Sequence, residues 1–356
     1  MPRIHPLIAR ARREGTPLID GQTVTFVWEG KTAPFLLGDF NDWQKDHPLV
    51  FVSDAPEVWI STLSIPKDAY LEYAYFKNLE DDQRQVDRFN NRKVNNGVGQ
   101  FNHYFYMPET GPTDLVNERD GIPHGEITRH YVSIDEMAVG KRRTVYLYHP
   151  PVREPLPLLI VYDGADYLRR ARLPVIVDNL ISEGRIRPLA MAFINHGGPA
   201  RFVEYSCSEA TLGLILLKLL PLAQNKLNLI DIGQSPGAFG ILGASMGGLM
   251  SLFTGLRLPH IFGRVLSQSG SFTTWEYDLV VYDLVRSLNK PAPRVWMDVG
   301  RYEWLLETNQ RMRALMEEKG LQVTYREYNG GHNYHSWRDD VWRGLECLFG
   351  NKAGLD

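Results

Sequence analysis

The sequence GASMGG, residues 243–248, decides the fold that we expect for this chain. It stands directly between a short apolar run, Phe239–Leu242, and an apolar helix-like segment that begins near Leu249. A Gly-x-Ser-x-Gly element in this context is typical of a nucleophile elbow, where a serine occupies a strained turn between a strand and a helix. Small residues are needed on both sides of the serine because the two backbones nearly touch. Ser245 is therefore the predicted nucleophile.

An oxyanion hole is expected beside this serine. The helix that follows offers its N-terminal N–H groups, and the backbone N–H of Met246 is the first predicted donor. A second donor comes from the loop after an earlier strand in such folds. Asp163-Gly164-Ala165 follows the apolar run Pro157–Tyr162, so we expect Ala165 to donate and Asp163 and Gly164 to line the substrate. An ordinary Asp-Gly turn without chemistry is the alternative.

A second Gly-x-Ser-x-Gly sequence shows how weak the bare motif is. Ser235 lies in Gly233–Gly237 and also fits the pattern. The residue after it is Pro236, which has no N–H to donate to an oxyanion. A strand, not a helix, is expected from Ala238 onward. Ser235 is therefore interpreted as a loop residue.

The base of the site is expected near the C-terminus, because the order in this kind of site is serine, acid, histidine. His332 follows the pair Gly330-Gly331, after a β-like run at Gln322–Glu327. We predict that the glycines form a flexible loop and that His332 is the general base. His335 is the alternative, with a role at the rim of the site as its more ordinary interpretation.

The acid should follow the predicted strand Arg294–Val299. Asp298, still inside that strand, and Glu303, beyond Gly300, are both candidates. Placement in a loop favours Glu303, although a solvated carboxylate at a helix start is an equally ordinary role for it. The residues alone leave this choice open.

Residues 1–108 are expected to form an N-terminal domain. A short basic amphipathic helix is expected within Met1–Gly15, and alternating apolar and polar residues then predict an antiparallel β-sandwich. The expected strands are Gln22–Trp28, Val58–Ile65, Leu71–Phe76 and Asn102–Tyr106. Residues 109–124 are rich in Pro, Gly and acidic side chains, and we interpret them as a linker.

Residues 125–356 are expected to form the catalytic domain, of the α/β class. Short apolar strands alternate with helices there, which predicts a mostly parallel sheet covered on both faces, the α/β-hydrolase fold. The expected strands are Thr144–Tyr148, Pro157–Tyr162, Leu189–Ile194, Phe239–Leu242, Arg264–Ser267 and Arg294–Val299, and the expected helices are Ala171–Glu183, Ala210–Lys226 and Leu305–Lys319.

Composition narrows the classes of partner. The 356 residues are 44% hydrophobic and 23% charged, with a formal net charge of -3, so we expect neither nucleic acid nor an anionic membrane surface as partner. No signal for secretion is evident, and Cys207 and Cys347 lie in unlike contexts. We therefore expect a cytoplasmic protein without disulfides, metal or organic cofactor, and a homodimer is possible.

Four ordered motifs resemble the enterochelin esterase group of the esterase D family. They are LGASMGGLMSL (242–252), FGRVLSQSGSF (262–272), DVGRYEWLLETNQRM (298–312) and GGHNYHSWR (330–338), within a resemblance that covers Pro123–Phe349. It implies Glu303 as the acid and His332 as the base, and it supports Ala165 in the oxyanion loop. It also implies that Arg201, in the RFVEY segment, and Trp337 line the substrate.

The N-terminal domain resembles the immunoglobulin-like early-set modules of such esterases. Its GDFNDW element, residues 38–43, looks like a turn of glycogen-branching and starch-binding modules. We expect a structural role, with Trp43 and Trp59 packed as core or interface aromatics.

The expected function is serine carboxylic-ester hydrolysis through a Ser-His-Glu acyl-enzyme mechanism. The resemblance implies a small carboxylic ester or a siderophore lactone as substrate. One alternative is a feruloyl or acetyl esterase acting on carbohydrate esters. Another is a non-catalytic carbohydrate-binding protein with a vestigial hydrolase domain.

Overall fold

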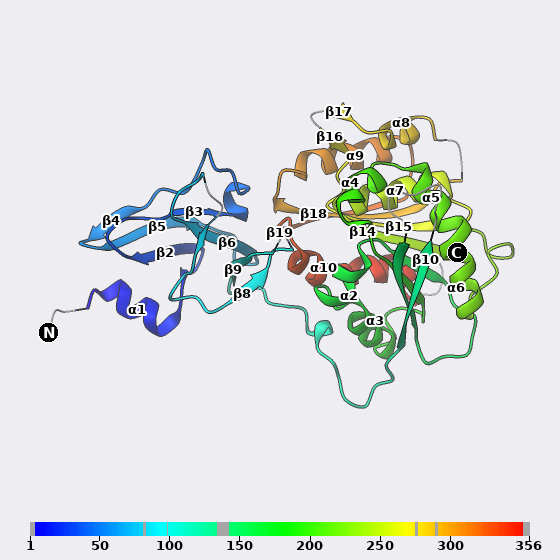
Figure 1. The fold of residues 1–356 in the computed structure, drawn as a ribbon, viewed down its shortest axis with the longest axis horizontal. Coiled ribbons are helices and arrows are strands. Elements are labelled where there is room, and N and C mark those ends of the chain that lie inside the picture. The colour runs from blue at the N-terminus through cyan, green and yellow to red at the C-terminus, as the bar shows by residue number, and fades with distance from the viewer. Residues whose placement is uncertain are drawn as a thin grey trace. The chain divides into compact units, whose positions relative to one another are not determined.

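The computed structural model describes residues 4–80, 83–97, 99–133, 142–274, 277–288 and 291–351. The chain divides into two compact units, which are described one at a time (Figure 1). The first unit contains Met1–Gly111, Gly300–Trp304 and Tyr328–Ser336. The second contains Pro112–Val299, Leu305–Glu327 and Trp337–Asp356. Two short segments that we expected in a catalytic domain of residues 125–356 thus group with the N-terminal residues.

The first unit opens with helix α1 and continues as two antiparallel sheets. One sheet has the order β1-β2-β5-β4, and in the other β6 pairs with β3, β7 and β9, and β8 pairs with β9. The elements are α1 (Pro6–Glu14), β1 (Leu18–Asp20), β2 (Thr23–Glu29), β3 (Phe35–Gly38), β4 (Val52–Ala55), β5 (Val58–Ser64), β6 (Tyr70–Phe76), β7 (Arg84–Gln85), β8 (Lys93–Asn95) and β9 (Phe101–Tyr106). The predicted strands of this region are confirmed.

Aromatic side chains from both sheets form the core of the first unit. Phe26 on β2 packs edge-on against Tyr73 on β6, with ring centroids 5.0 Å apart, and also contacts Phe105 on β9. Offset and edge-to-face pairs of this kind add to the stability that burial provides. The first unit is therefore a two-layered sandwich with its own core.

The second unit is built on a mostly parallel sheet with the order β10-β11-β13-β12-β14-β15-β18-β19. β10 and β11 are antiparallel to their neighbours, whereas β13, β12, β14, β15 and β18 pair in parallel. The strands are β10 (Glu126–Ser133), β11 (Arg142–His149), β12 (Leu158–Val161), β13 (Ala190–Ile194), β14 (Phe239–Ala244), β15 (Phe262–Gln268), β18 (Arg294–Tyr302) and β19 (Val323–Gly331), with a small hairpin of β16 (Thr273–Thr274) and β17 (Tyr277–Asp278).

Helices cover both faces of this sheet, as expected for the α/β class. Figure 1 shows α7, α8 and α9 on one side, and α2, α3 and α10 on the other. The helices are α2 (Gly164–Arg169), α3 (Leu173–Ser182), α4 (Arg201–Tyr205), α5 (Glu209–Leu214), α6 (Leu220–Lys226), α7 (Met246–Arg257), α8 (Val281–Arg286), α9 (Leu306–Glu318) and α10 (Tyr334–Phe349). Among the described residues no single helix is long and apolar enough to cross a bilayer, and only the bent pair Gly198–Tyr205 and Glu209–Lys226 reaches that length jointly.

Four local features differ from what the sequence led us to expect. Glu126–Ser133 forms edge strand β10, which was not predicted because most of its side chains are exposed and polar. The helix expected at Ala210–Lys226 is interrupted by a π-helical turn at Ile215–Leu219. The prediction of a flexible loop at Gly330-Gly331 is wrong, since β19 continues through both glycines.

Part of the expected linker is also packed, because Asn179 on α3 donates to the carbonyls of Leu115 and Asn117.

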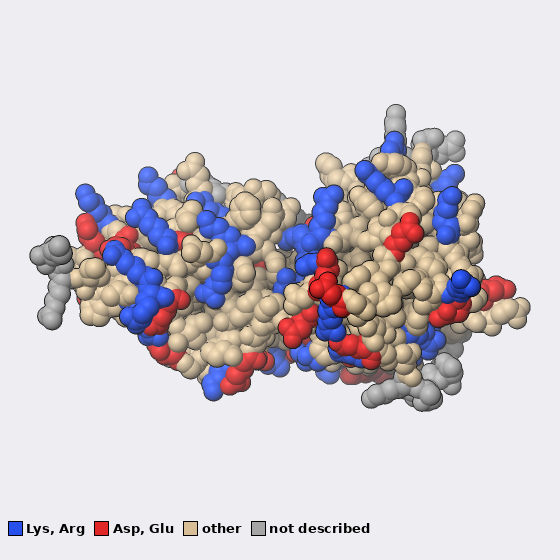
Figure 2. All heavy atoms as spheres, turned by 90° about the horizontal axis from the view of Figure 1, so that it is seen from below, with Lys and Arg blue, Asp and Glu red and all other residues tan. Residues whose placement is uncertain are grey.

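Charges are mixed on the surfaces of both units. On the faces that Figure 2 shows, basic and acidic side chains are interspersed. Many are paired, as Arg10 is with Asp20 (2.7 Å) and Arg286 with Asp278 (3.0 Å). Both cysteines are free in this structure.

Candidate active site

Ser245 lies between β14 and α7 with a strained backbone. Its φ is 59° and its ψ is -122°, a conformation that residues other than glycine rarely adopt. Hydrogen bonds hold it there: its N–H donates to the Gln268 carbonyl at 2.9 Å, and its carbonyl accepts from the N–H of Ser271 at 3.1 Å. Backbone strain that is maintained in this way is typical of functional sites.

Two glycines make the turn possible. A Cβ on Gly243 would lie 2.4 Å from the carbonyl carbon and oxygen of Gly247. The backbones of β14 and α7 therefore approach each other too closely for any side chain at Gly243. The sequence pattern predicted this close approach, and the structure has it.

The loop after β12 lies beside this turn. β12 and β14 are parallel neighbours, so their carboxyl ends lie at the same edge of the sheet. Asp163 has a φ of 51° and directly precedes α2, and a Cβ on Gly247 would lie 3.2 Å from its Oδ2. The backbone of Gly164 packs so tightly against Phe193 that a Cβ would lie 2.7 Å from the Phe193 carbonyl carbon. Ala165 follows, partly exposed, and Met246 is the first residue of α7.

A bidentate ion pair fixes this loop. Arg201 on α4 donates from Nε to Oδ1 of Asp163 at 2.8 Å and from Nη2 to Oδ2 at 2.7 Å. The Asp163 N–H donates to the hydroxyl of Tyr205, one turn further along α4. Such fork-shaped contacts are rigid as well as strong. They favour a positioning role for Asp163 and Arg201 over the direct substrate contact predicted from the sequence.

Glu303 and His332 meet in the first unit. Oε2 of Glu303 is bonded to Nδ1 of His332, and Oε1 accepts the N–H of Gly300 at 2.6 Å. The Glu303 side chain is fully shielded from solvent, whereas 16% of the His332 side chain stays exposed. The structure thus brings together the two residues that the family resemblance implied as acid and base.

Trp304 is an exposed aromatic beside this pair that the sequence did not single out. Its ring centroid lies 4.5 Å from that of His332, with the planes tilted by 40°. The residue is 55% exposed, so the indole is not buried in a core. Only its position next to Glu303 in the sequence could have drawn attention to it.

The rival acid and base have other surroundings. Asp298 is fully buried in the second unit, where it accepts from Trp296 Nε1 at 2.8 Å and from Gln268 Nε2. His335 lies between aromatic rings of the first unit and stacks on Tyr104 with centroids 6.0 Å apart. These surroundings favour packing and structural roles for both residues.

Two further residues that the sequence analysis discussed have ordinary structural surroundings. Trp337 is 4% exposed and its indole N–H donates to Ser269 Oγ at 2.9 Å, which favours packing over contact with substrate. Ser235 lies in an exposed turn that follows Asp231, and the strand β14 begins shortly after it, as expected.

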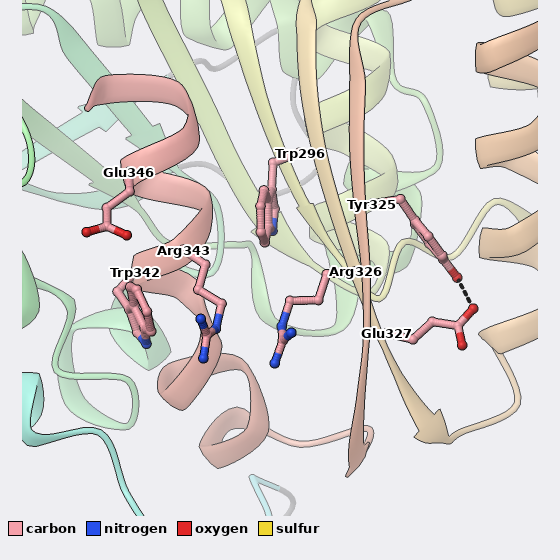
Figure 3. Close-up of a pocket in the computed structure, with 7 residues that line it drawn as sticks. All are labelled: Trp296, Tyr325, Arg326, Glu327, Trp342, Arg343 and Glu346. Carbon is pink, nitrogen blue, oxygen red and sulfur yellow. Dashed lines mark hydrogen bonds between the residues drawn. The ribbon is translucent and has the colours of Figure 1, made fainter. Parts of the chain in front are cut away.

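A surface pocket of about 500 Å³ in the second unit contains none of the predicted site residues. Figure 3 shows Arg326 and Arg343 directing their guanidinium groups to the same side of it. Both arginines are paired with the same carboxylate, Asp340, at 2.9 Å each, so one of their two positive charges is offset. In the described part of the chain, no three His, Cys, Asp or Glu side chains gather as a metal site requires.

The chain is similar in sequence to known esterases. Residues 137–346 match the family model named Esterase. An iron(III) enterobactin esterase of Dickeya dadantii is 30% identical over 231 residues, which are 59% of this chain and 52% of that protein. The chain thus spans about half the length of the curated relatives it matches.

The fold of this chain is also similar to those of solved esterase structures. The ferric enterobactin esterase of Salmonella typhimurium superimposes with a TM-score of 0.79 at 20% identity, over 92% of this chain and 93% of that one. A ferulic acid esterase superimposes with a TM-score of 0.54 at 16% identity, over 64% of this chain and 98% of its own. At these identities the likeness shows a shared fold.

Proposed function

The chain belongs to the Esterase family, and from this premise we propose that it is a serine carboxylic-ester hydrolase with Ser245 as nucleophile. The observation that carries the proposal is the positive φ of Ser245 between β14 and α7. Non-glycine residues keep such a conformation only where the surroundings enforce it, and a nucleophile elbow needs it. The matching α/β-hydrolase topology supports the same conclusion.

In the proposed mechanism, Nε2 of His332 accepts the Ser245 hydroxyl proton as Oγ bonds to the ester carbonyl carbon. Glu303 holds Nδ1–H and stabilises the imidazolium that forms. The backbone N–H groups of Ala165 and Met246 stabilise the oxyanion. The tetrahedral intermediate then collapses, the C–O bond to the alcohol breaks, and the imidazolium protonates the leaving oxygen. Water attacks the acyl enzyme by the same steps and releases the acid.

The electrostatics of the oxyanion loop fit this role. The buried carboxylate of Asp163 would oppose a developing negative charge, and Arg201 neutralises it through two hydrogen bonds. The same contacts fix the loop backbone, so that the Ala165 N–H can be held in place before the reaction. Preorganised donors of this kind need no rearrangement at the moment of reaction.

For the substrate, we propose a small carboxylic ester or a siderophore lactone. The relatives named iron(III) enterobactin esterase support the lactone. A second candidate, a feruloyl or acetyl ester of a carbohydrate, is favoured by the superposition on a ferulic acid esterase. Methyl ferulate, p-nitrophenyl acetate and a ferric catecholate trilactone, assayed side by side, separate these substrates by kcat/KM.

We propose that the sandwich of the first unit is an immunoglobulin-like early-set module with a structural role. The indole N–H of Trp43 donates to Asp39, and that of Trp59 donates to the Gly30 carbonyl at 2.8 Å. Both tryptophans are thus used inside the unit. This supports packing over the sugar platforms that carbohydrate binding would need.

Ser245→Ala tests the proposed function, with Ser235→Ala as the matched control from the other Gly-x-Ser-x-Gly sequence. We expect Ser245→Ala to lose at least about 10³-fold in kcat on p-nitrophenyl butyrate. We expect Ser235→Ala to match wild type. A fluorophosphonate probe should label wild type and Ser235→Ala, but not Ser245→Ala. Equal turnover by wild type and Ser245→Ala would overturn the proposal and favour a non-catalytic protein.

A further inference from the structure

The turn Gly38–Trp43 of the first unit contacts both segments that return to it from later in the sequence. Its first aspartate, Asp39, is buried and accepts three hydrogen bonds. Two come from its own sandwich, the Glu72 N–H and the Trp43 indole N–H, each at 2.8 Å. The third comes from the side-chain amide of Asn333 at 3.3 Å. Asn333 directly follows His332, so Asp39 holds the segment that carries the predicted base.

The second aspartate of the turn lies near the other segment. The half-buried carboxylate of Asp42 lies near the backbone of Trp304, which directly follows Glu303, and this neighbour lowers the Asp42 pKa. Glu303 and His332 also lie close enough to affect the pKa of Asp42, although its burial, which raises the pKa, is the largest effect. One aspartate of this short turn therefore binds the residue next to the base, and the other lies near the residue next to the acid.

Steric contact fixes the same arrangement. A Cβ on Gly331 would lie 2.1 Å from Cγ of Asp39, so the strand that ends before His332 lies directly against this carboxylate. The backbones of the two segments also touch each other, since a Cβ on Gly300 would lie 2.2 Å from the Gly330 carbonyl oxygen. These glycines therefore serve close packing in this unit.

The turn itself is rigid. The Gly38 N–H donates to Asn41 Oδ1 at 2.9 Å, and the Asn41 amide donates to the His47 carbonyl at 2.8 Å. Asp42 and Trp43 both have positive φ values, 56° and 57°. A turn with such internal hydrogen bonds can hold what it binds in one position.

We propose that the Gly38–Trp43 turn holds the acid–base pair in position. Asp39 is then a positioning residue for His332, and Asp42 is one for Glu303. This inference rests on the proposed esterase function. It assigns to the sandwich a positioning part in catalysis, because the orientation of the imidazole then depends on a turn far away in the sequence. A base displaced by about 1 Å can cost a hundredfold in rate.

The first experiment compares Asp39→Asn and Asp42→Asn with Asp87→Asn. Asp87 is the matched control, because it is an equally buried aspartate of the sandwich that accepts from Thr16 Oγ1 and the Tyr73 hydroxyl, each at 2.7 Å. We expect kcat on p-nitrophenyl butyrate to fall about tenfold or more in the first two variants, with KM within about twofold of wild type. Asp87→Asn should keep the wild-type kcat.

Endpoint titration with a fluorophosphonate counts the active sites in each preparation and separates positioning from misfolding. A positioning role lowers turnover per titrated site, whereas unfolding lowers only the number of sites. If turnover per site in Asp39→Asn and Asp42→Asn equals that of Asp87→Asn, the inference is overturned. The proposed function is judged separately, because it fails only if Ser245→Ala stays active.

The second experiment tests the contact between Asp39 and Gly331 directly. Gly331→Ala should lower kcat, because the new Cβ would collide with the Asp39 carboxylate. The double variant with Asp39→Ala removes the collision, so we expect its kcat to equal or exceed that of Gly331→Ala alone. Losses that multiply in the double variant would show two independent sites and would overturn the inference.

Discussion

One oxygen of the Glu303 carboxylate is bonded to Nδ1 of His332, and the other accepts the N–H of Gly300. A carboxylate that accepts at Nδ1 fixes the proton there and leaves Nε2 with a free lone pair. A general base needs that lone pair to accept the proton of a nucleophile. Because the Gly300 N–H holds the second oxygen, the carboxylate can rotate away from the imidazole only by breaking two hydrogen bonds.

Glu303→Gln should abolish most of the activity and leave the fold intact. The amide can donate to Nδ1, which stabilises the tautomer with its proton on Nε2. We expect kcat on p-nitrophenyl butyrate to fall about 10⁴-fold, the loss seen when the triad carboxylate of a serine protease is neutralised. The thermal unfolding midpoint should stay within a few degrees of wild type.

Asp298→Asn is the matched comparison, since it changes the rival acid. It removes the charge that accepts from Trp296 Nε1 and Gln268 Nε2 in a fully buried position. We expect a lower unfolding midpoint with kcat within a few-fold of wild type. If instead Asp298→Asn loses all turnover and Glu303→Gln retains it, the acid has been misassigned.

Trp304→Ala should slow turnover moderately. An aromatic face next to His332, with centroids 4.5 Å apart, stabilises the imidazolium that forms during the reaction. At an exposed position such an interaction is worth about 0.5–1 kcal/mol, so we expect a two- to fivefold loss in kcat. Tyr277→Ala, at a residue that is 77% exposed, serves as control and should keep wild-type kcat. Trp304→Phe should recover part of the loss, and full activity of Trp304→Ala would refute the stacking role.

Gly243→Ala should destabilise the second unit. The new Cβ would lie 2.4 Å from the backbone of Gly247, which cannot move without shifting α7. Overpacking of this kind costs about 1–3 kcal/mol. Gly111→Ala is the control, because its Cβ would meet nothing within 4 Å. Urea denaturation measures the free energy of unfolding of each variant. If Gly243→Ala were as stable as Gly111→Ala, this result would contradict the close approach of β14 and α7.

The elements of the fold that depend on local pattern could be predicted from the sequence. Alternation predicted β2 and β5, and the apolar run before Ser245 predicted β14. The glycines around Ser245 pointed to a close approach of two backbones, since few other constraints require small residues at that spacing. β10 escaped prediction because an exposed edge strand needs no apolar face.

The parts that depend on contacts between distant residues could not be predicted. Asp39 and Asn333 are 294 residues apart, and no local pattern links them. The GDFNDW element drew attention as a family-like turn, but its contacts with the later segments have no signal in a single sequence. The choice between Asp298 and Glu303 likewise needed the family resemblance, because both fit the spacing after a strand.

Asp39 should make stability depend on pH in a specific direction. Its burial and the neighbouring Glu72 raise its pKa well above the usual value near 4. Just above the usual value, Asp39 in the folded chain still keeps a proton that it has lost in the unfolded chain. The free energy of unfolding therefore falls as pH rises through this range. Asp39→Asn should therefore remove part of the decline in urea midpoint as pH rises above about 4. Asp46→Asn, at an exposed aspartate, is the control. If the urea midpoint of Asp39→Asn fell with pH as steeply as that of wild type, the Asp39 carboxyl would titrate alike in the folded and the unfolded chain.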